Sequence, residues 1–101
     1  MLNNIILVGR VTTSPTSQTK TLTIATERSY KNTNTNTYDT DFFKIALSNG
    51  ILETAINYLK EGDLVGVKGH LETNEKEIKI ICDRLTFLSN RTQNNMGKGE
   101  I

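Results

Sequence analysis

The sequence predicts an all-β domain with one helix, built as a five-stranded antiparallel barrel of the Greek-key type. Three observations predict it. Five segments show the alternation or the β-branched enrichment that is typical of strands, and turn residues separate them. One further segment, between the third and fourth strands, has apolar residues at helical spacing. With 101 residues, of which 36% are apolar, the chain has room for one domain with one core.

The first predicted strand runs from Leu2 to Val11 and has the β-branched run expected of a well-buried strand. Gly9 within it suggests a bulge or a sharp bend, as occurs where a small barrel turns a corner. A polar loop covers residues 12–20. The second strand, 21–26, alternates almost strictly, which is typical of an antiparallel strand with one buried face.

The next hairpin carries an aromatic ring beside cations on each arm. Tyr30 follows the second strand, and the Asn-Thr repeat at 32–37 is expected to form the tip. The third strand, 41–47, places Phe42 and Lys44 on the face opposite to its apolar residues. A ring next to a positive charge suits a base and its phosphate. Alternatively, the two rings cover the core and the lysine is an ordinary solvated charge.

The helix is predicted after the break at 48–50, with Glu53 in its first turn, Lys60 in its last turn and Gly62 placed to end it. Its apolar stripe is expected to plug one end of the sheet. The last two strands are predicted at 63–71 and 77–88, joined by a tight turn at 73–76.

The composition limits the classes of function that are open to this chain. The formal net charge is only +1, so a nucleic-acid site must depend on the local placement of charges. One cysteine and one histidine make no plausible zinc site, so we expect Cys82 to be a small buried hydrophobe and no cofactor to be bound. No segment has the length of a membrane span or the pattern of a signal peptide, which predicts a cytoplasmic protein. No nucleophile and base are paired in the sequence, so we expect no enzymatic activity.

The order of five strands with one helix between the third and fourth fits the OB-fold. The face formed by its second and third strands, with the connecting loops, commonly binds oligonucleotides. An SH3-like barrel also has five strands, but it does not normally insert a helix of this length there. We expect the OB-fold domain to cover residues 1–89 and a short flexible tail to follow at 90–101.

Several stretches of the sequence resemble the bacterial and phage single-stranded DNA-binding proteins. The resemblance covers about residues 1–89, in the family's order. No single stretch is decisive, but the opening strand and the helix exit with the strand after it make a specific combination. The stretches are Met1 to Arg10, Arg28 to Lys31, Asp41 to Phe43, and Tyr58 to Leu71.

The resemblance implies sequence-independent binding of single-stranded DNA in replication, recombination or repair. It implies that Tyr30 and Phe42 stack on bases and that the chain forms a homo-oligomer, a tetramer or else a dimer. The implied phosphate contacts are Arg10, Lys20, Arg28, Lys31 and Lys44. The implied interface residues are Val11, Gly66, Lys68 and His70.

The chain departs from the family's pattern in three places. Ser48 stands where many members carry an aromatic residue, and the hairpin at 73–76 is short and has no ring. The end of the chain lacks the acidic, apolar tip that recruits repair proteins, so we expect that recruitment to be absent. These departures suggest a reduced binding site in a phage or mobile-element paralogue. The alternative is a primosome-type accessory protein that uses the OB-fold for protein contacts.

Overall fold

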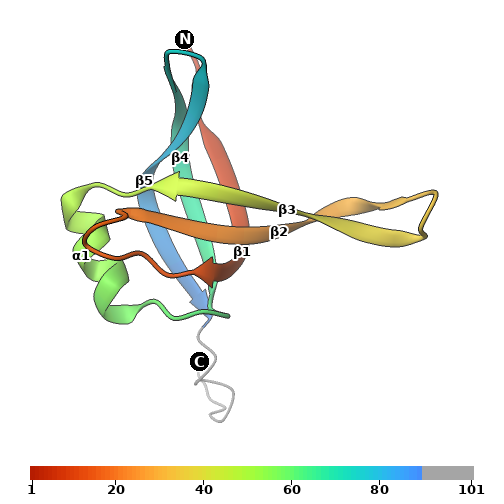
Figure 1. Cartoon of the computed structure of the whole chain (residues 1–101), viewed down its shortest axis with the longest axis horizontal. Coiled ribbons are helices and arrows are strands. Elements are labelled where there is room, and N and C mark those ends of the chain that lie inside the picture. Colours follow the sequence, from red (N-terminus) through yellow and green to blue (C-terminus); the bar gives the residue numbers. More distant parts are fainter. Residues whose placement is uncertain (90–101) are drawn as a thin grey trace.

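A computed structural model describes residues 1–89, and it forms the predicted closed barrel with one helix. The strands follow one another around the barrel in the order β1-β2-β3-β5-β4 (Figure 1). The predicted fold class is therefore confirmed, and the predicted tail at 90–101 lies outside the described residues. The elements are β1 (Ile5–Thr13), β2 (Thr21–Asn32), β3 (Thr37–Ala46), α1 (Asn49–Tyr58), β4 (Leu64–Asn74) and β5 (Glu77–Ser89).

One strand pair differs from the antiparallel prediction. β3 and β5 run parallel, and their register contains only Ile45 opposite Ile80 and Ala46 opposite Ile81. The other four pairs are antiparallel. Because the ladder between β3 and β5 is so short, the two strands diverge on either side of it and leave room for a groove.

The core lies inside the barrel, where the predicted alternation is confirmed. Leu22 and Ile24 of β2 and Ile45 of β3 are fully buried. Burying an aliphatic side chain of this size contributes about 1.5–3 kcal/mol. Helix α1 closes one end of the barrel and adds Leu52 and Ala55 to the core, as its apolar stripe predicted (Figure 1).

The helix differs from the prediction at both ends. Ser48 occupies the N-cap position without a capping hydrogen bond from its side chain, and Glu53 lies beyond the first turn. The helix ends at Tyr58, so no basic residue lies in its last turn, and Gly62 (φ 94°) belongs to the turn that leads into β4. With ten residues, α1 falls short of what a helix needs to cross a membrane, and the described residues contain no helix that meets that requirement.

Strand β1 is buried on one face only, which corrects the expectation of a well-buried strand. Ile6 is 74% exposed and Val8 is 48% exposed. The irregularity of β1 lies between Val11 and Thr13 and not at Gly9. Position 9 needs glycine for another reason, because a Cβ on Gly9 would lie 2.5 Å from the backbone oxygen of Ala25.

Cys82 is buried in the core, as predicted. Burial raises the pKa of its thiol to about 11, so the group stays protonated at neutral pH. A protonated buried thiol is a poor nucleophile and a poor metal ligand, and it packs as a small apolar group.

Two hairpins project from the barrel, one formed by β2 and β3 and the other by β4 and β5 (Figure 1). The tip of the first contains the predicted Asn-Thr turn, and Asn36 adopts a positive φ of 58°. The second closes in a tight turn at Glu75 and Lys76, within the predicted turn, but β4 continues to Asn74, beyond its predicted end at 71. The N-terminus lies beside this second hairpin, where the Asn3 amide exchanges hydrogen bonds of 2.8 and 2.9 Å with the backbone of Leu71.

Candidate nucleic-acid interface

The outer side of β3 presents a continuous row of exposed side chains. Exposed and partly buried residues alternate along the strand, as the side chains of a strand point to opposite faces in turn. Phe42 is 65% exposed, so its ring stands open to solvent as the sequence predicted. We call this face the β3 outer row; its members are Tyr38, Thr40, Phe42 and Lys44.

The neighbours of Phe42 on the sheet are small or flexible. In the register, Ala25 of β2 lies opposite Phe42, and Arg10 of β1 lies opposite Ala25. In the same way Thr23 lies opposite Lys44. Directly opposite residues share a face, so the ring of Phe42 lies beside the small side chain of Ala25. Lys44 and Arg10 are the cations on the same face. This arrangement leaves a ring face accessible to a base.

A groove of about 290 Å³ opens where β3 and β5 diverge. It brings Lys44 of the β3 outer row next to Lys79 of β5. Neither lysine takes part in an ion pair within residues 1–89, so both charges remain available to a phosphate. The lining residues are Thr21, Lys44, Ala46, Glu77, Ile78, Lys79 and Ile80.

The sequence analysis did not identify Lys79 and Ile78 as site residues. Ile78 is 70% exposed because β5 extends past the barrel at this point. The alternation of β5 indicates that the two side chains point to opposite sides, but it does not reveal which strand lies beside them. The parallel pairing of β3 with β5 makes them neighbours of Lys44.

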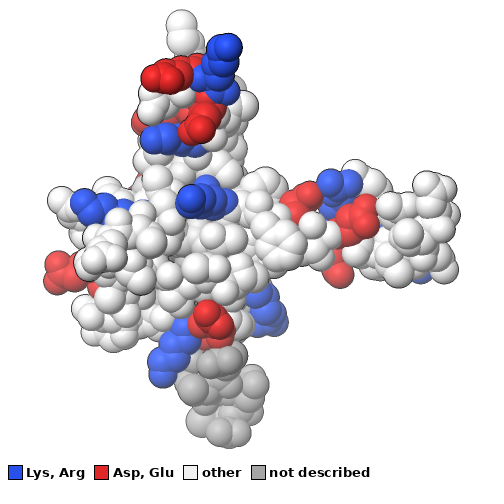
Figure 2. Space-filling view, in the orientation of Figure 1, with Lys and Arg blue, Asp and Glu red and all other residues white. Residues whose placement is uncertain are grey.

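Arg28, predicted to contact phosphate, is already paired. Its guanidinium donates two hydrogen bonds of 2.9 Å to the carboxylate of Asp41 and lies 3.7 Å from Asp39. The hydrogen bond to Asp41 raises the pKa of Arg28, and it lowers the pKa of Asp41. A phosphate would have to compete with two carboxylates for this cation. Figure 2 shows the same mixture of signs on the projecting hairpins, whereas the barrel between them is mostly uncharged.

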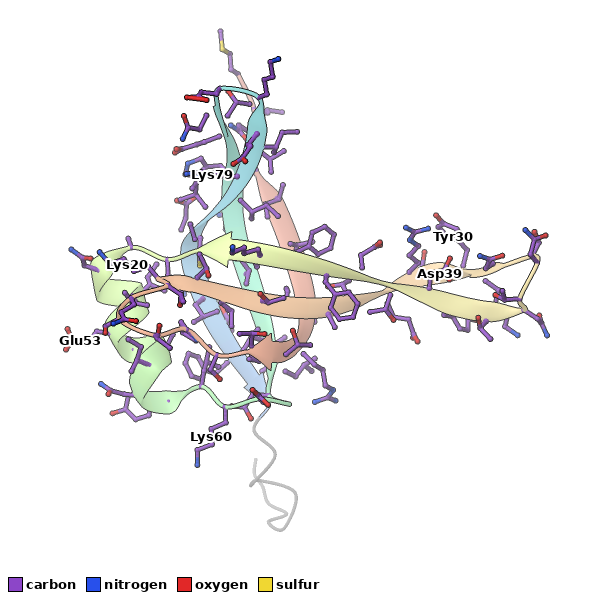
Figure 3. All side chains as sticks on the ribbon, in the orientation of Figure 1. Lys20, Tyr30, Asp39, Glu53, Lys60 and Lys79 are labelled. Atoms are coloured by element: carbon purple, nitrogen blue, oxygen red, sulfur yellow. The ribbon has the colours of Figure 1, made fainter. Side chains whose placement is uncertain are left out.

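Tyr30 lies apart from the β3 outer row. It is 62% exposed and belongs to the irregular segment of β2 between Glu27 and Lys31. Figure 3 shows it beside Asp39 on the far half of the hairpin, and its phenol helps to raise the pKa of Arg28, after the larger effects of Asp41. The structure therefore places the two predicted stacking residues on one hairpin but in different surroundings.

The remaining predicted phosphate contacts are spread over the molecule. Lys31 lies over the ring of Tyr38, with its Nζ 5.7 Å from the ring centroid. Lys20 lies near α1, at the end of β2 that is remote from the hairpin tip (Figure 3). Arg10 donates a hydrogen bond of 3.1 Å to the backbone oxygen of Gly62. Of the predicted cations, Lys44 alone lines the groove.

A second exposed face lies on β1 and β4. Ile6 and Val8 of β1 alternate with core residues, and a Cβ placed on Gly66 would pack 3.5 Å from the side chain of Leu88. We call this the β1–β4 outer face; it contains Ile6, Val8, Gly66, Lys68, His70 and Leu88.

The predicted interface residues divide between this face and the core. Gly66, Lys68 and His70 lie on the β1–β4 outer face, as alternate residues of β4. Val11 does not, because its side chain is only 2% exposed and belongs to the core. The assignment of the Val11 side chain to an interface is therefore wrong.

His70 is bound by two carboxylates on the β1–β4 outer face. Its Nδ1 lies 2.8 Å from Asp83 and its Nε2 lies 2.7 Å from Glu72. The hydrogen bond to Asp83, followed by that to Glu72, raises the pKa of His70. Within residues 1–89, no group of three or more His, Cys, Asp or Glu side chains is placed to hold a metal ion.

Comparison with known families and proteins gives consistent matches. The model of the Single-strand binding protein family matches residues 2–80. A single-stranded DNA-binding protein of Enterococcus faecalis is 30% identical over 91% of this chain, which spans 57% of that protein. A single-stranded DNA-binding protein of Staphylococcus aureus is 32% identical over the whole of this chain, and the match covers 77% of that protein.

Two solved structures of single-stranded DNA-binding proteins have a similar fold. The Plasmodium falciparum SSB complex with ssDNA has a TM-score of 0.67 and 27% identity, and the match covers 88% of this chain and 96% of that one. A small single-stranded DNA binding protein from Mycoplasma pneumoniae has a TM-score of 0.65, and the match covers 100% of this chain and 94% of that one. At 17% identity, the second likeness shows the fold alone.

Proposed function

Because this chain belongs to the single-strand binding protein family, we propose that it binds single-stranded DNA without regard to base sequence. The binding serves DNA replication, recombination or repair, and it takes place in the cytoplasm. The chain traps strands that have opened and keeps them from pairing again. This function needs no step in which a bond is made or broken.

The observation that carries this proposal is the exposed ring of Phe42 beside Lys44 at the mouth of the groove. An open aromatic face accepts a base of any identity, because every base has a π-face. Such a stack contributes roughly 1–3 kcal/mol per base. Lys44 and Lys79 lie where the phosphates of a strand that enters the groove would pass.

The charges make the binding dependent on salt. Each phosphate contact releases counterions, so the logarithm of the binding constant falls with the logarithm of the salt concentration, with a slope of roughly 0.7 per contact on a single strand. The formal net charge of +1 adds little general attraction for DNA. The affinity therefore depends on a few local contacts.

We also propose that the chain forms a homo-oligomer, a tetramer or a dimer, through the β1–β4 outer face. Ile6, Val8 and Leu88 are all about half exposed or more on this face. Adjacent exposed aliphatic side chains are a feature of surfaces that bind another protein. A second copy of the same face would cover them on both chains at once, as a two-fold axis allows.

An anisotropy titration of labelled oligo-dT tests the DNA-binding proposal. We expect tight binding that weakens with salt and that duplex DNA does not compete. Replacing Phe42 by alanine should weaken it roughly 5- to 150-fold, which corresponds to the loss of one stack. Tyr58→Ala is the matched control, because Tyr58 is an equally exposed ring (64%) at the end of α1, outside the groove lining.

Three outcomes would contradict the proposal. Absence of binding at low salt would show that the OB-fold serves protein contacts, as in a primosome-type accessory protein. Binding by Phe42→Ala that equals wild type would show that the β3 outer row is not the site. A loss with Tyr58→Ala as large as that with Phe42→Ala would mean that general damage, and not a lost stack, explains the effect.

A further inference from the structure

The β3 outer row contains a second ring that the sequence analysis did not consider. Tyr38 lies four residues before Phe42, and the two share the exposed face of β3. At about 3.3 Å per residue, the two rings are roughly 13 Å apart along the strand. Tyr38 is 46% exposed, so its ring is accessible in the same way as that of Phe42.

A cation accompanies each of these rings. Lys31 lies directly opposite Tyr38 in the register of β2 and β3, with its Nζ 5.7 Å from the ring centroid. Lys44 lies two residues beyond Phe42 on the same face. The lysine chain is long and flexible, so its ammonium group can move from the ring to a phosphate and leave the ring face to a base. The pattern of a ring with a lysine is thus present twice along one strand.

Tyr30 lacks these surroundings. It lies close to Arg28, whose charge is neutralised by Asp41 and Asp39, so no cation beside it is available without breaking an ion pair. The β3 outer row itself carries no carboxylate. Glu27 of β2 lies opposite its Thr40, and Glu77 lines the groove with Lys44 and Lys79, so a path along β3 to the groove has three lysines, Lys31 included, and two carboxylates. The local charge therefore favours a polyanion along β3 over one that follows Tyr30.

We propose that Tyr38 is a base-stacking residue and that the bound strand follows the β3 outer row. The strand runs from Tyr38 over Phe42 to the groove at Lys44 and Lys79, a path of about 20 Å from Tyr38 to Lys44 at 3.3 Å per residue. This inference rests on the proposed single-strand binding. It assigns to Tyr38 the second base-stacking position, which the family resemblance implied for Tyr30.

The test compares alanine variants with oligo-dT of graded length at one salt concentration. Tyr38→Ala should weaken binding of long oligonucleotides roughly 5- to 150-fold and have no effect on the shortest ones, which reach only Phe42 and the groove. Tyr38→Phe should bind like wild type, because stacking needs the ring and not the hydroxyl group. Tyr58→Ala controls for the loss of an exposed tyrosine elsewhere.

The outcomes separate this inference from the proposed function. If Tyr38→Ala binds all lengths like wild type while Phe42→Ala is weakened, the inference is overturned and the proposed function stands. If Tyr30→Ala is weakened and Tyr38→Ala is not, the strand follows the other side of the hairpin and the inference is again wrong. If no variant binds less well, the proposed site itself fails.

A fluorescent variant keeps the inference testable if Tyr38→Ala does not fold. The chain contains no tryptophan, so Tyr38→Trp introduces a single reporter. We expect its emission to be quenched when a long oligonucleotide is bound, because the indole stacks on a base. A Tyr58→Trp variant should show no change. Unchanged emission of Tyr38→Trp at saturating DNA would overturn the inference.

Discussion

The β3 outer row and the β1–β4 outer face are both exposed, yet they differ in which groups accompany their apolar side chains. On the first, the rings of Phe42 and Tyr38 lie beside lysines, and those of the groove have no ion pair within residues 1–89. On the second, aliphatic side chains lie beside Lys68 and beside His70, which is hydrogen-bonded to two carboxylates. Exposure alone therefore does not assign a partner.

The difference teaches that aromatic rings with lysines beside them distinguish the proposed nucleic-acid surface from the proposed protein surface, where the exposed apolar side chains are aliphatic. A polyanion gains most from cations that have no carboxylate nearby, because it displaces only counterions. A second protein chain gains most from apolar area whose neighbouring charges are already satisfied. Arg28 shows the rule within one hairpin, because Asp41 removes it from the set of free cations.

The largest expected effect would come from a charge placed on the β1–β4 outer face. Val8→Asp should dissociate the proposed oligomer, because an unpaired carboxylate buried between chains costs several kcal/mol. We expect the dissociation constant of the oligomer to rise by more than about 100-fold. Sedimentation velocity measures this change, and Tyr58→Asp serves as a control for an added charge elsewhere.

The same variant examines whether the two faces are independent. Each Val8→Asp chain should still bind a short oligo-dT with nearly the affinity of wild type, because Phe42 lies on a different face. A wild-type protein that sediments as a monomer would break the comparison, since no protein partner would then explain the exposed aliphatic side chains. Loss of short-oligonucleotide binding in Val8→Asp would also break it.

A smaller effect is expected from the free lysines of the groove. Replacing Lys44 and Lys79 by glutamine should reduce the salt slope of single-strand binding by roughly 0.7 for each. Lys60→Gln is the matched control, because Lys60 lies beyond the end of α1 and away from the groove (Figure 3). Titrations at several salt concentrations give the slopes. An unchanged slope in the double variant would mean that the strand does not cross the groove.

The smallest expected effect concerns pH and the His70 cluster. Its carboxylate partners raise the pKa of His70 in the folded chain above the usual 6.5. The stabilisation is therefore fully present below pH 6.5 and is lost as the pH rises through the raised pKa. Urea unfolding of wild type should show this decline. His70→Gln should lack it, and the difference between the two should shrink towards alkaline pH.

A contrary result would be a difference that grows with pH. That would mean that the neutral imidazole, and not the imidazolium, is the stabilising form. DNA binding should not follow the same pH dependence in either protein, because His70 lies on the β1–β4 outer face. A shared pH dependence would show that the two faces are coupled.

The local pattern of the sequence was sufficient for the type and order of the elements and for two of the four residues of the β3 outer row. It placed the start of the third strand at 41, whereas β3 begins at Thr37 and so includes Tyr38. The alternation of β3 predicted that Phe42 and Lys44 share an exposed face, and the structure confirms that exposure. The helical spacing after Gly50 predicted the plug at the end of the barrel. Such patterns act over a few residues, and the period of a strand or helix fixes which side chains share a face.

The tertiary structure decided which residues are neighbours across strands. It brought Lys79 to Lys44 through the parallel pair of β3 and β5, and it buried Val11 in the core. It also paired Arg28 with Asp41 on the neighbouring strand, a contact between residues 13 positions apart. These outcomes depend on strand order and register, which are properties of the whole barrel. The sequence determined which side chains share a face, and the closed barrel determined which charged side chains are neighbours across strands.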